Sequence, residues 1–394
     1  MMPTLSHRAL ALPESAIRKL DFSVMQQRDV SFFRLNIGQP DVPTPLPMLQ
    51  AIADYQPKVV AYGPASGTVE CRTAGAKYHS RWCPQLNSSH VAVTTGGSEA
   101  LLFAFTAICD PGDEILVPEP YYTNYNGFST VAGTHIRPIR TRLEDGFALP
   151  PDDELDSFLT PRTRALVFSN PGNPTGAVYE KGEMLRILDW AKRRDIFVIS
   201  DEVYRRIYFG QPPMSALESD EHSQHVVIID SLSKTYSACG IRLGFLISRN
   251  ELLMEKVERL GQARLGPQLL AQAVGNVALA LPESYYEEVR TIYKTRVDAL
   301  VGALDDLADV SSHRPEGAFY CMTKLPVDDT EAFARFLVTD FRSNGQSVIV
   351  APGGGFYSDP ALGRHEIRLA AVTDGDSLRR AIQILGEALG AYRQ

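Results

Sequence analysis

The central part of this 394-residue chain alternates short apolar runs with longer amphipathic stretches. Residues 91–94 form one such run, and after two glycines residues 98–107 show the apolar spacing of a helix. Further short runs occupy residues 114–117, 165–168, 196–199 and 226–229. Apolar runs of this length bounded by turn residues are typical of buried parallel strands. The alternation therefore predicts an α/β fold, with a mainly parallel sheet and helices on both of its faces.

Three of these runs lead directly into polar residues. Asn173 follows the first of the three, Asp201 and Tyr204 follow the second, and Lys234 follows the third. In open α/β sheets, ligands bind outside the carboxyl ends of the strands. We therefore expect these side chains to surround one crevice.

The third strand end also carries groups that suit a phosphate. Lys234 stands in Ser231-Leu-Ser-Lys-Thr-Tyr236, and Arg242 follows one short loop later. A lysine after a strand usually faces solvent, so this segment is weak on its own. With the other two strand ends it offers a Schiff-base lysine, together with Ser231, Ser233 and Arg242 as phosphate donors. The combination predicts pyridoxal 5'-phosphate as the cofactor.

The whole set of motifs resembles the class I and II pyridoxal-phosphate-dependent aminotransferases, which have the aspartate aminotransferase fold. The resemblance rests on the three strand ends and on residues 15–20, 35–41, 61–64, 95–101 and 365–369. It covers nearly the whole chain. It implies a large cofactor-binding domain at 46–282 with a seven-stranded type of sheet, and a smaller α/β domain made of 1–45 and 283–394.

The sequence after Pro282 indicates the elements of the smaller domain. The pattern predicts a long helix at 283–307 and a final helix at 376–392. Between them it predicts strands at 317–322 and 347–350, a loop at 352–355, and a segment at 363–372 in which Arg368 lies in a strand between Ile367 and Leu369.

The resemblance implies catalytic roles for Lys234, Asp201 and Tyr204. Lys234 holds the cofactor as a Schiff base and, once displaced by the substrate amine, acts as the general base. Asp201 pairs with the pyridine nitrogen and keeps the ring an electron acceptor. Capping of the following turn is the alternative for this carboxylate. Tyr204 and Asn173 hydrogen-bond the ring oxygen beside the Schiff base.

Other positions are implied to hold the phosphate and the ring. Gly97 and Ser98 open a helix directly after a strand, where backbone N–H groups favour an anion. Tyr122 matches the aromatic residue that stacks on the pyridine ring, but its neighbour Tyr121 leaves the choice open. Tyr62 matches the residue that reaches the phosphate of the neighbouring subunit, which implies a homodimer with shared active sites.

The resemblance also indicates how a substrate binds. Arg368 matches the arginine that grips the α-carboxylate, and the alternation around it places its side chain opposite its apolar neighbours. Gly38 and Asn173 match residues that assist it. Arg264 is a candidate for a second carboxylate of the substrate, and an ion pair at a helix end is an equally open alternative for it.

Composition argues against several other classes of protein. The net charge of -8 and the absence of a basic run disfavour a nucleic-acid or membrane partner. We expect no metal site, because the eight histidines lack ligand spacing. The N-terminus has no segment of signal-peptide type. The five scattered cysteines never form a Cys-x-x-Cys pair, which is typical of a reduced, cytoplasmic protein.

The activity implied is transamination between an L-amino acid, aspartate-like or other, and a 2-oxo acid such as 2-oxoglutarate. Two alternatives stay open. A β-lyase, or a cyclising or oxidising enzyme of a secondary-metabolite pathway, would keep Lys234, Asp201 and Arg242. A regulator with an aminotransferase-like effector module would need a preceding DNA-binding domain, for which the motif at 15–20 leaves no room.

Overall fold

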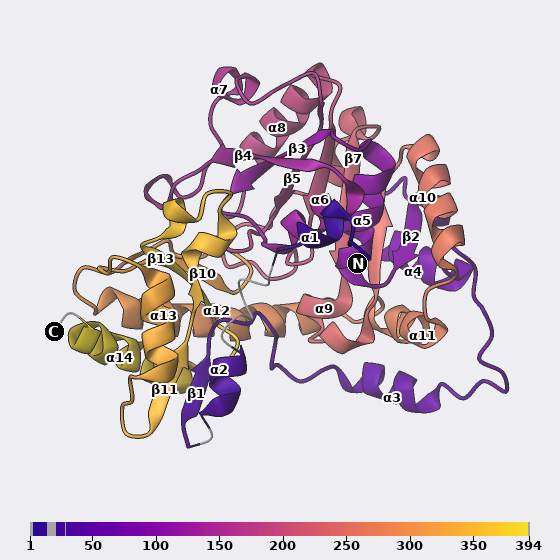
Figure 1. Ribbon diagram of the computed structural model, residues 1–394. Coiled ribbons are helices and arrows are strands. Elements are labelled where there is room, and N and C mark those ends of the chain that lie inside the picture. Colours follow the sequence, from indigo (N-terminus) through magenta and orange to yellow (C-terminus); the bar gives the residue numbers. More distant parts are fainter. Residues whose placement is uncertain (1–2, 14–20, 28, 393–394) are drawn as a thin grey trace.

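The computed structural model describes residues 3–13, 21–27 and 29–392, so the motif expected at 15–20 lies outside the described residues. Its largest sheet has seven strands in the order β2-β8-β7-β6-β5-β3-β4 (Figure 1). Of these, β8 is antiparallel to both of its neighbours, and the remaining pairs are parallel. The strands are β2 (Val91–Thr94), β3 (Glu114–Glu119), β4 (His135–Arg140), β5 (Thr163–Ser169), β6 (Phe197–Asp201), β7 (Val226–Ser231) and β8 (Gly244–Ile247).

Each central strand sends side chains into two apolar layers. In β5, Leu166 and Phe168 pack into one layer, whereas Ala165 and Val167 pack into the other. The first layer contains residues of α4 (Val69–His79), α8 (Lys181–Arg193) and α11 (Leu269–Ala278). The second contains residues of α5 (Gly96–Ile108), α6 (Asn124–Ala132) and α10 (Glu251–Arg264). Because successive strand residues point to opposite faces, a continuous apolar run requires this double cover, and the predicted fold class is confirmed.

A second group of elements forms its own core, drawn mainly in orange and yellow in Figure 1. It contains an antiparallel sheet in the order β12-β13-β10-β9 and a parallel pair, β1 with β11. The strands are β1 (Ser31–Arg34), β9 (Ser311–Ser312), β10 (Tyr320–Lys324), β11 (Gln346–Ile349), β12 (Ala351–Pro352) and β13 (Glu366–Ala370). The helices are α12 (Glu283–Asp305), α13 (Thr330–Thr339) and α14 (Gly375–Tyr392).

The remaining helices are shorter or lie at the surface. They are α1 (His7–Leu10), α2 (Asp21–Gln26), α3 (Leu46–Asp54), α7 (Asp152–Asp156) and α9 (Leu232–Thr235). Within the part of the chain that the structure describes, none of the helices is long and apolar enough to cross a bilayer. The same residues include no cluster of His, Cys, Asp and Glu side chains that would hold a metal ion.

Two predictions for the second group of elements need correction. The strand expected at 317–322 begins only at Tyr320, because Ala318 has a left-handed backbone with φ 55° and Gly317 forms a separate bridge to Tyr208. The loop expected at 352–355 is partly regular. Pro352 pairs with β13, and a 3-10 turn, Gly353–Phe356, follows it.

Candidate active site

The carboxyl ends of β5, β6 and β7 meet at one edge of the large sheet, because these strands are neighbours. Ser169 at the end of β5 pairs with Asp201 at the end of β6, and Asp201 pairs with Ile229 of β7. The short helix α9, which carries Lys234, begins directly after β7. The register therefore brings the three predicted strand ends together.

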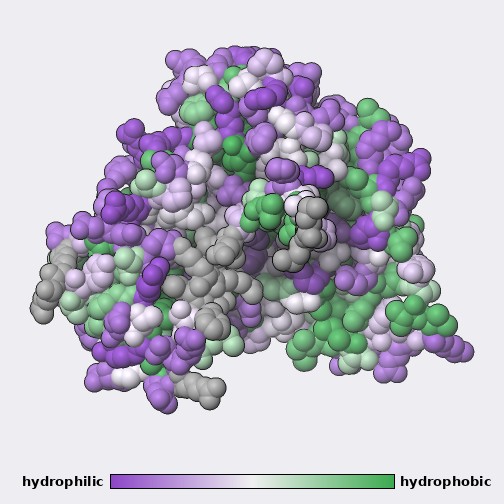
Figure 2. All heavy atoms as spheres, in the orientation of Figure 1, coloured by the Kyte–Doolittle hydropathy of each residue, from purple (hydrophilic) through white to green (hydrophobic). Residues whose placement is uncertain are grey.

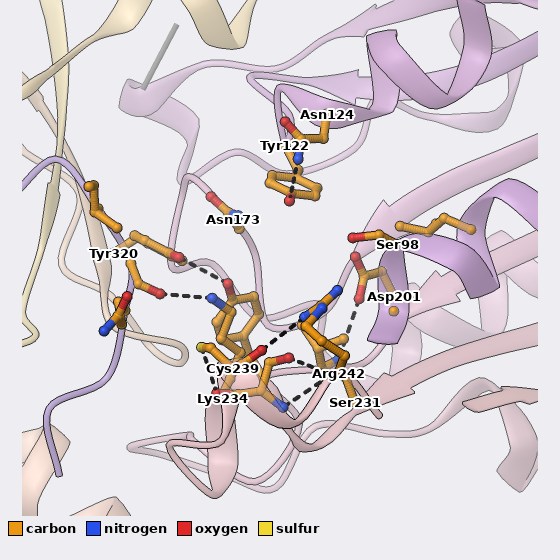
Figure 3. A pocket seen from close by; sticks show the side chains of 18 of the residues that line it. Ser98, Tyr122, Asn124, Asn173, Asp201, Ser231, Lys234, Cys239, Arg242 and Tyr320 are labelled. Atoms are coloured by element: carbon orange, nitrogen blue, oxygen red, sulfur yellow. Dashed lines mark hydrogen bonds between the residues drawn. The ribbon is translucent and has the colours of Figure 1, made fainter. Parts of the chain in front are cut away.

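A cavity of about 310 Å³ opens at this edge (Figure 3). All of the predicted site residues except Tyr62 and Arg264 line it. The predicted residues in the lining are Gly38, Gly97, Ser98, Tyr122, Asn173, Asp201, Tyr204, Ser231, Ser233, Lys234, Arg242 and Arg368. Seven further residues line the cavity without having been predicted: Ile37, Gln39, Leu101, Asn124, Val203, Cys239 and Tyr320.

One end of the cavity is suited to an anion. Helix α5 begins at Gly96 directly after β2, so the backbone N–H groups of Gly97 and Ser98 lie in its first turn, where they have no intrahelical partner. The guanidinium of Arg242 lies against this turn. A Cβ on Gly96, whose φ is 74°, would lie 2.5 Å from Nη2 of Arg242. Only glycine allows this approach, which places a cation beside the helix N-terminus.

Lys234 also lines the cavity. Its Nζ donates a hydrogen bond to the carbonyl oxygen of Gly38 at 2.7 Å. The turn that carries it is fixed by Ser231, whose hydroxyl accepts from the backbone N–H of Ser233 and lies 2.8 Å from the Ser233 hydroxyl. This capping ends β7 and starts α9, so both hydroxyls and the lysine face the same space.

Asp201 lies buried at the back of the cavity. Its Oδ2 accepts a hydrogen bond from the Tyr125 hydroxyl at 3.0 Å. Burial raises the pKa of Asp201 to about 7, although the Tyr125 hydrogen bond works in the opposite direction. The backbone N–H of Val203 lies 3.4 Å from Oδ1, so the capping contact is present but long. A cationic partner in the cavity would return this carboxyl to its ordinary ionisation.

The two tyrosines at the other predicted position can now be distinguished. Tyr122 lines the cavity, and its hydroxyl accepts a hydrogen bond from the Asn124 amide at 2.8 Å. Burial raises the pKa of Tyr122 to about 12. Tyr121 instead points into the interior, where its hydroxyl donates to Asn126. Tyr122 is therefore the aromatic residue that faces the cavity.

Arg368 is a buried cation that also lines the cavity. Its Nη1 donates to Oδ1 of Asn173 at 3.1 Å, and its Nη2 donates to the backbone carbonyl of Asn36. Its guanidinium lies 4.4 Å from the ring centroid of Tyr320 and 4.9 Å from that of Phe356. Among the described residues, its Nε has no hydrogen-bond partner. Burial lowers the pKa of Arg368, as expected for a cation that lacks an anion.

Tyr62 and Arg264 lie outside this lining. The Tyr62 side chain is 85% exposed. Arg264, the last residue of α10, forms an ion pair with Glu99 and donates to the Ala65 carbonyl at 3.1 Å. The ion pair that the sequence left open for Arg264 is therefore formed. Its contact with a substrate in a neighbouring subunit stays a prediction.

The residues present fit pyridoxal phosphate. The cavity is lined by anion donors, a lysine, a buried carboxyl group and a buried arginine. No sequence motif points to Tyr125 or Tyr320. Both are recognised only through contacts with residues far away in the chain, Asp201 and Tyr204 respectively.

Comparisons with known proteins identify the family of the chain. The profile described as "Aminotransferase class I and II" matches residues 30–385. The aspartate/prephenate aminotransferase of Thermus thermophilus is 30% identical, covering 99% of this chain and 100% of that protein. The aspartate aminotransferase of Thermotoga maritima is 29% identical, covering 98% of this chain and 99% of that protein.

Solved structures agree with the sequence matches. The aspartate aminotransferase of Thermus thermophilus with maleate superposes with a TM-score of 0.89 at 28% identity, covering 98% of this chain and 100% of that one. An alanine aminotransferase from Pyrococcus furiosus gives a TM-score of 0.89 at 30% identity, with the same coverage. The chain belongs to the class I and II aminotransferases and is a pyridoxal-phosphate-dependent transaminase.

Proposed function

We propose that Arg368 receives the α-carboxylate of an amino acid while Lys234 anchors the cofactor and moves the Cα proton. The observation that carries this proposal is that Arg368, a buried cation whose described hydrogen bonds go to the neutral Asn173 side chain and the Asn36 carbonyl, lines the same cavity as Lys234. A carboxylate that binds the guanidinium in a bidentate manner would supply the missing negative charge. It would also orient the amino acid toward the lysine, and such orientation contributes to the rate.

The other lining residues are assigned around these two. When bound, pyridoxal phosphate supplies the electron sink that makes the Cα–H bond acidic. We assign Asp201 to its ring nitrogen, Tyr122 to its ring face, and Tyr204 and Asn173 to its ring oxygen. The Oδ1 atom of Asn173 is already bonded to Arg368, which leaves its amide N–H₂ as the donor. The phosphate is assigned to Gly97, Ser98, Ser231, Ser233 and Arg242.

The amino donor and acceptor are proposed from the relatives. Those described above are named for aspartate, prephenate and alanine, so we propose an L-amino acid, aspartate-like or other, with 2-oxoglutarate as one oxo acid. Single-turnover spectra of the loaded enzyme with a panel of amino acids would show which ones convert the cofactor to pyridoxamine phosphate. Failure of every amino acid in the panel would contradict this assignment.

The central residue is tested by Lys234→Ala. We expect this variant to fold, to bind pyridoxal phosphate without a covalent link, and to lose multiple turnover. Non-covalent binding should survive because Arg242, Ser231 and the first turn of α5 hold the phosphate independently. Lys256→Ala, which changes a surface lysine paired with Glu255, is the matched control. Sustained transamination by Lys234→Ala would overturn the proposal.

We also propose that the enzyme is a homodimer in which Tyr62 enters the partner's site. Figure 2 shows hydrophobic residues gathered at the lower right, where Figure 1 draws α3. Exposed large hydrophobic residues in and after α3 support this proposal: Leu46, Leu49, Val59, Val60, Tyr62 and Val69. A patch of this kind usually marks an interface. Without a partner, Tyr62 has no anion to bind in the described chain.

The domain division and the compartment are proposals as well. The separate apolar cores support a large domain at 46–282 and a small domain made of 1–45 and 283–394. All five cysteines are free thiols. This supports a reducing compartment, and we propose the cytoplasm.

A further inference from the structure

Tyr320 is one of the cavity residues that link the antiparallel sheet to the large sheet. It is the first residue of β10, in the same antiparallel sheet as Arg368, whereas Tyr204 and Lys234 follow strands of the large sheet. The Tyr320 side chain is buried and lines the cavity, where Figure 3 draws it among the other lining residues.

Three groups with proposed roles contact this one side chain. The Tyr320 hydroxyl lies 3.0 Å from the Tyr204 hydroxyl. Its ring lies under the guanidinium of Arg368, with 4.4 Å between the centroid and Cζ. Its hydroxyl also fills the space in front of Gly38, because a Cβ built on Gly38 would lie 1.7 Å from that oxygen. The carbonyl of Gly38 is in turn the acceptor for Lys234.

Which of the two hydroxyls donates the hydrogen bond decides what Tyr320 does. Either oxygen of the pair can be the donor, and each hydroxyl has only one proton. If Tyr204 donates its proton to Tyr320, it has no proton left to donate to the cofactor. If Tyr320 donates, the proton of Tyr204 stays available for the ring oxygen to which Tyr204 is assigned.

We propose that Tyr320 is a positioning residue that donates its hydroxyl proton to Tyr204 and so directs the Tyr204 proton toward the ring oxygen of pyridoxal phosphate. This inference rests on the proposed role of Tyr204. Hydrogen bonds in a chain polarise one another, so the Tyr320 donor strengthens the one that Tyr204 makes. A stronger donor to an anionic ring oxygen favours the unprotonated form of the lysine-linked cofactor, and thus lowers its pKa.

The test is a pH titration of the absorption of the loaded enzyme, without substrate. Tyr320→Phe removes the hydroxyl and keeps the ring over Arg368. We expect the pKa of the bound cofactor to rise by roughly 0.3–1 unit, a fraction of the effect of removing a whole charge-assisted hydrogen bond. Tyr204→Phe should raise it further. The double variant should match Tyr204→Phe, because Tyr320 acts only through Tyr204.

A second buried tyrosine pair provides the matched control. The Tyr236 and Tyr286 hydroxyls lie 2.8 Å apart outside the cavity lining, so Tyr286→Phe should leave the titration unchanged.

Binding of acetate as an unreactive carboxylate separates the role of the Tyr320 ring from that of its hydroxyl. It should be unchanged in Tyr320→Phe and several-fold weaker in Tyr320→Leu, which also removes the ring below Arg368.

The outcomes distinguish this inference from the proposed function. An unchanged or lowered pKa in Tyr320→Phe, with a raised one in Tyr204→Phe, would overturn the role of Tyr320 alone. Equal shifts that add in the double variant would do the same, since they would show that the two residues act independently. If Tyr204→Phe also leaves the titration unchanged, the assignment of Tyr204 to the ring oxygen fails with it.

Discussion

At the scale of single residues, the site buries ionisable groups that lack an oppositely charged partner until a ligand binds. Asp201 is buried with one phenol donor and a long backbone contact. Arg368 is buried, and its described hydrogen bonds go to neutral acceptors, the Asn173 side chain and the Asn36 carbonyl. Both arrangements cost free energy in the ligand-free protein and are relieved by opposite charges of a cofactor and a substrate. Sites that bind charged ligands commonly lose stability in this way.

The buried carboxyl group of Asp201 should make the effect of Asp201→Asn on stability depend on pH. The pKa of Asp201 is raised from 3.8 to about 7 in the folded protein. The folded state therefore keeps this proton at pH values where the unfolded chain has released it, and stability falls as pH rises from about 4 to about 7. Asparagine has no such proton. Cofactor-free Asp201→Asn should be more stable than the wild type at pH 8, with a smaller advantage at pH 5.

Denaturant unfolding of cofactor-free protein at the two pH values measures this difference. Asp54→Asn, at an exposed position in α3, should give the same result at both. An advantage of Asp201→Asn that does not change with pH would show that desolvation of the carboxylate is not its source. The loaded variant should lose roughly 10²–10³ in rate, the usual effect of removing a charge that stabilises a transition state.

At the scale of elements, the anion-binding end of the cavity depends on close packing of the backbones of β2, β8 and α5 against one another. Thr94 at the end of β2 pairs with Gly244 at the start of β8. Helix α5 begins two residues after Thr94, at Gly96. A Cβ on Gly244 would lie 2.4 Å from the carbonyl carbon of Gly96 and 2.6 Å from the backbone nitrogen of Gly97. The position of the phosphate donors is thus set by the absence of a side chain at Gly244.

Gly244→Ala should therefore harm both stability and cofactor binding. Overpacking of this kind costs on the order of 1–3 kcal/mol, and the displaced first turn of α5 should weaken binding of pyridoxal phosphate. Gly240→Ala is the matched control four residues away, because a Cβ there meets nothing within 4 Å. Thermal unfolding and cofactor titration of the two variants would check this. Equal melting temperatures would show that the backbones separate at little cost.

The elements that carry the site were predictable where local pattern and topology agree. The apolar runs predict β5, β6 and β7, because a strand buried on both faces admits few polar residues. Parallel pairing then aligns their ends. The antiparallel orientation of β8 has no local signal. Nor does the contact of Tyr125 with Asp201 or of Tyr320 with Tyr204, since each depends on packing between distant segments.

At the scale of the whole molecule, the site lies where two packed groups of elements meet. Lys234 follows a strand of the large sheet, while Arg368 lies in the antiparallel sheet. In the cavity, the two groups are linked directly by contacts such as the Tyr204–Tyr320 pair, the bond from Arg368 to Asn173 and the bond from Lys234 to the Gly38 carbonyl. A substrate that bridges Arg368 and the cofactor would therefore join the two groups more firmly, by an amount that its own binding energy sets.

The shared site of the proposed homodimer is tested by hybrids of two variants. Lys234→Ala removes the lysine from a subunit's own site, whereas Tyr62→Ala removes a contact that we assign to the partner's site. In a dimer with one subunit of each kind, one site combines Lys234 of the second subunit with Tyr62 of the first and is intact. Purified hybrids should show about half of the wild-type activity per dimer at a cofactor concentration that leaves Tyr62→Ala homodimers largely empty.

A second hybrid gives the opposite expectation, which makes the test decisive. A subunit with both substitutions, paired with a wild-type subunit, has one site without a lysine and one site without Tyr62. It should be nearly inactive at the same cofactor concentration if Tyr62 acts on the partner's site. If Tyr62 instead acted within its own subunit, the wild-type subunit would keep a complete site. The second hybrid would then be half-active and the first inactive, because two substitutions interact only when they affect the same site.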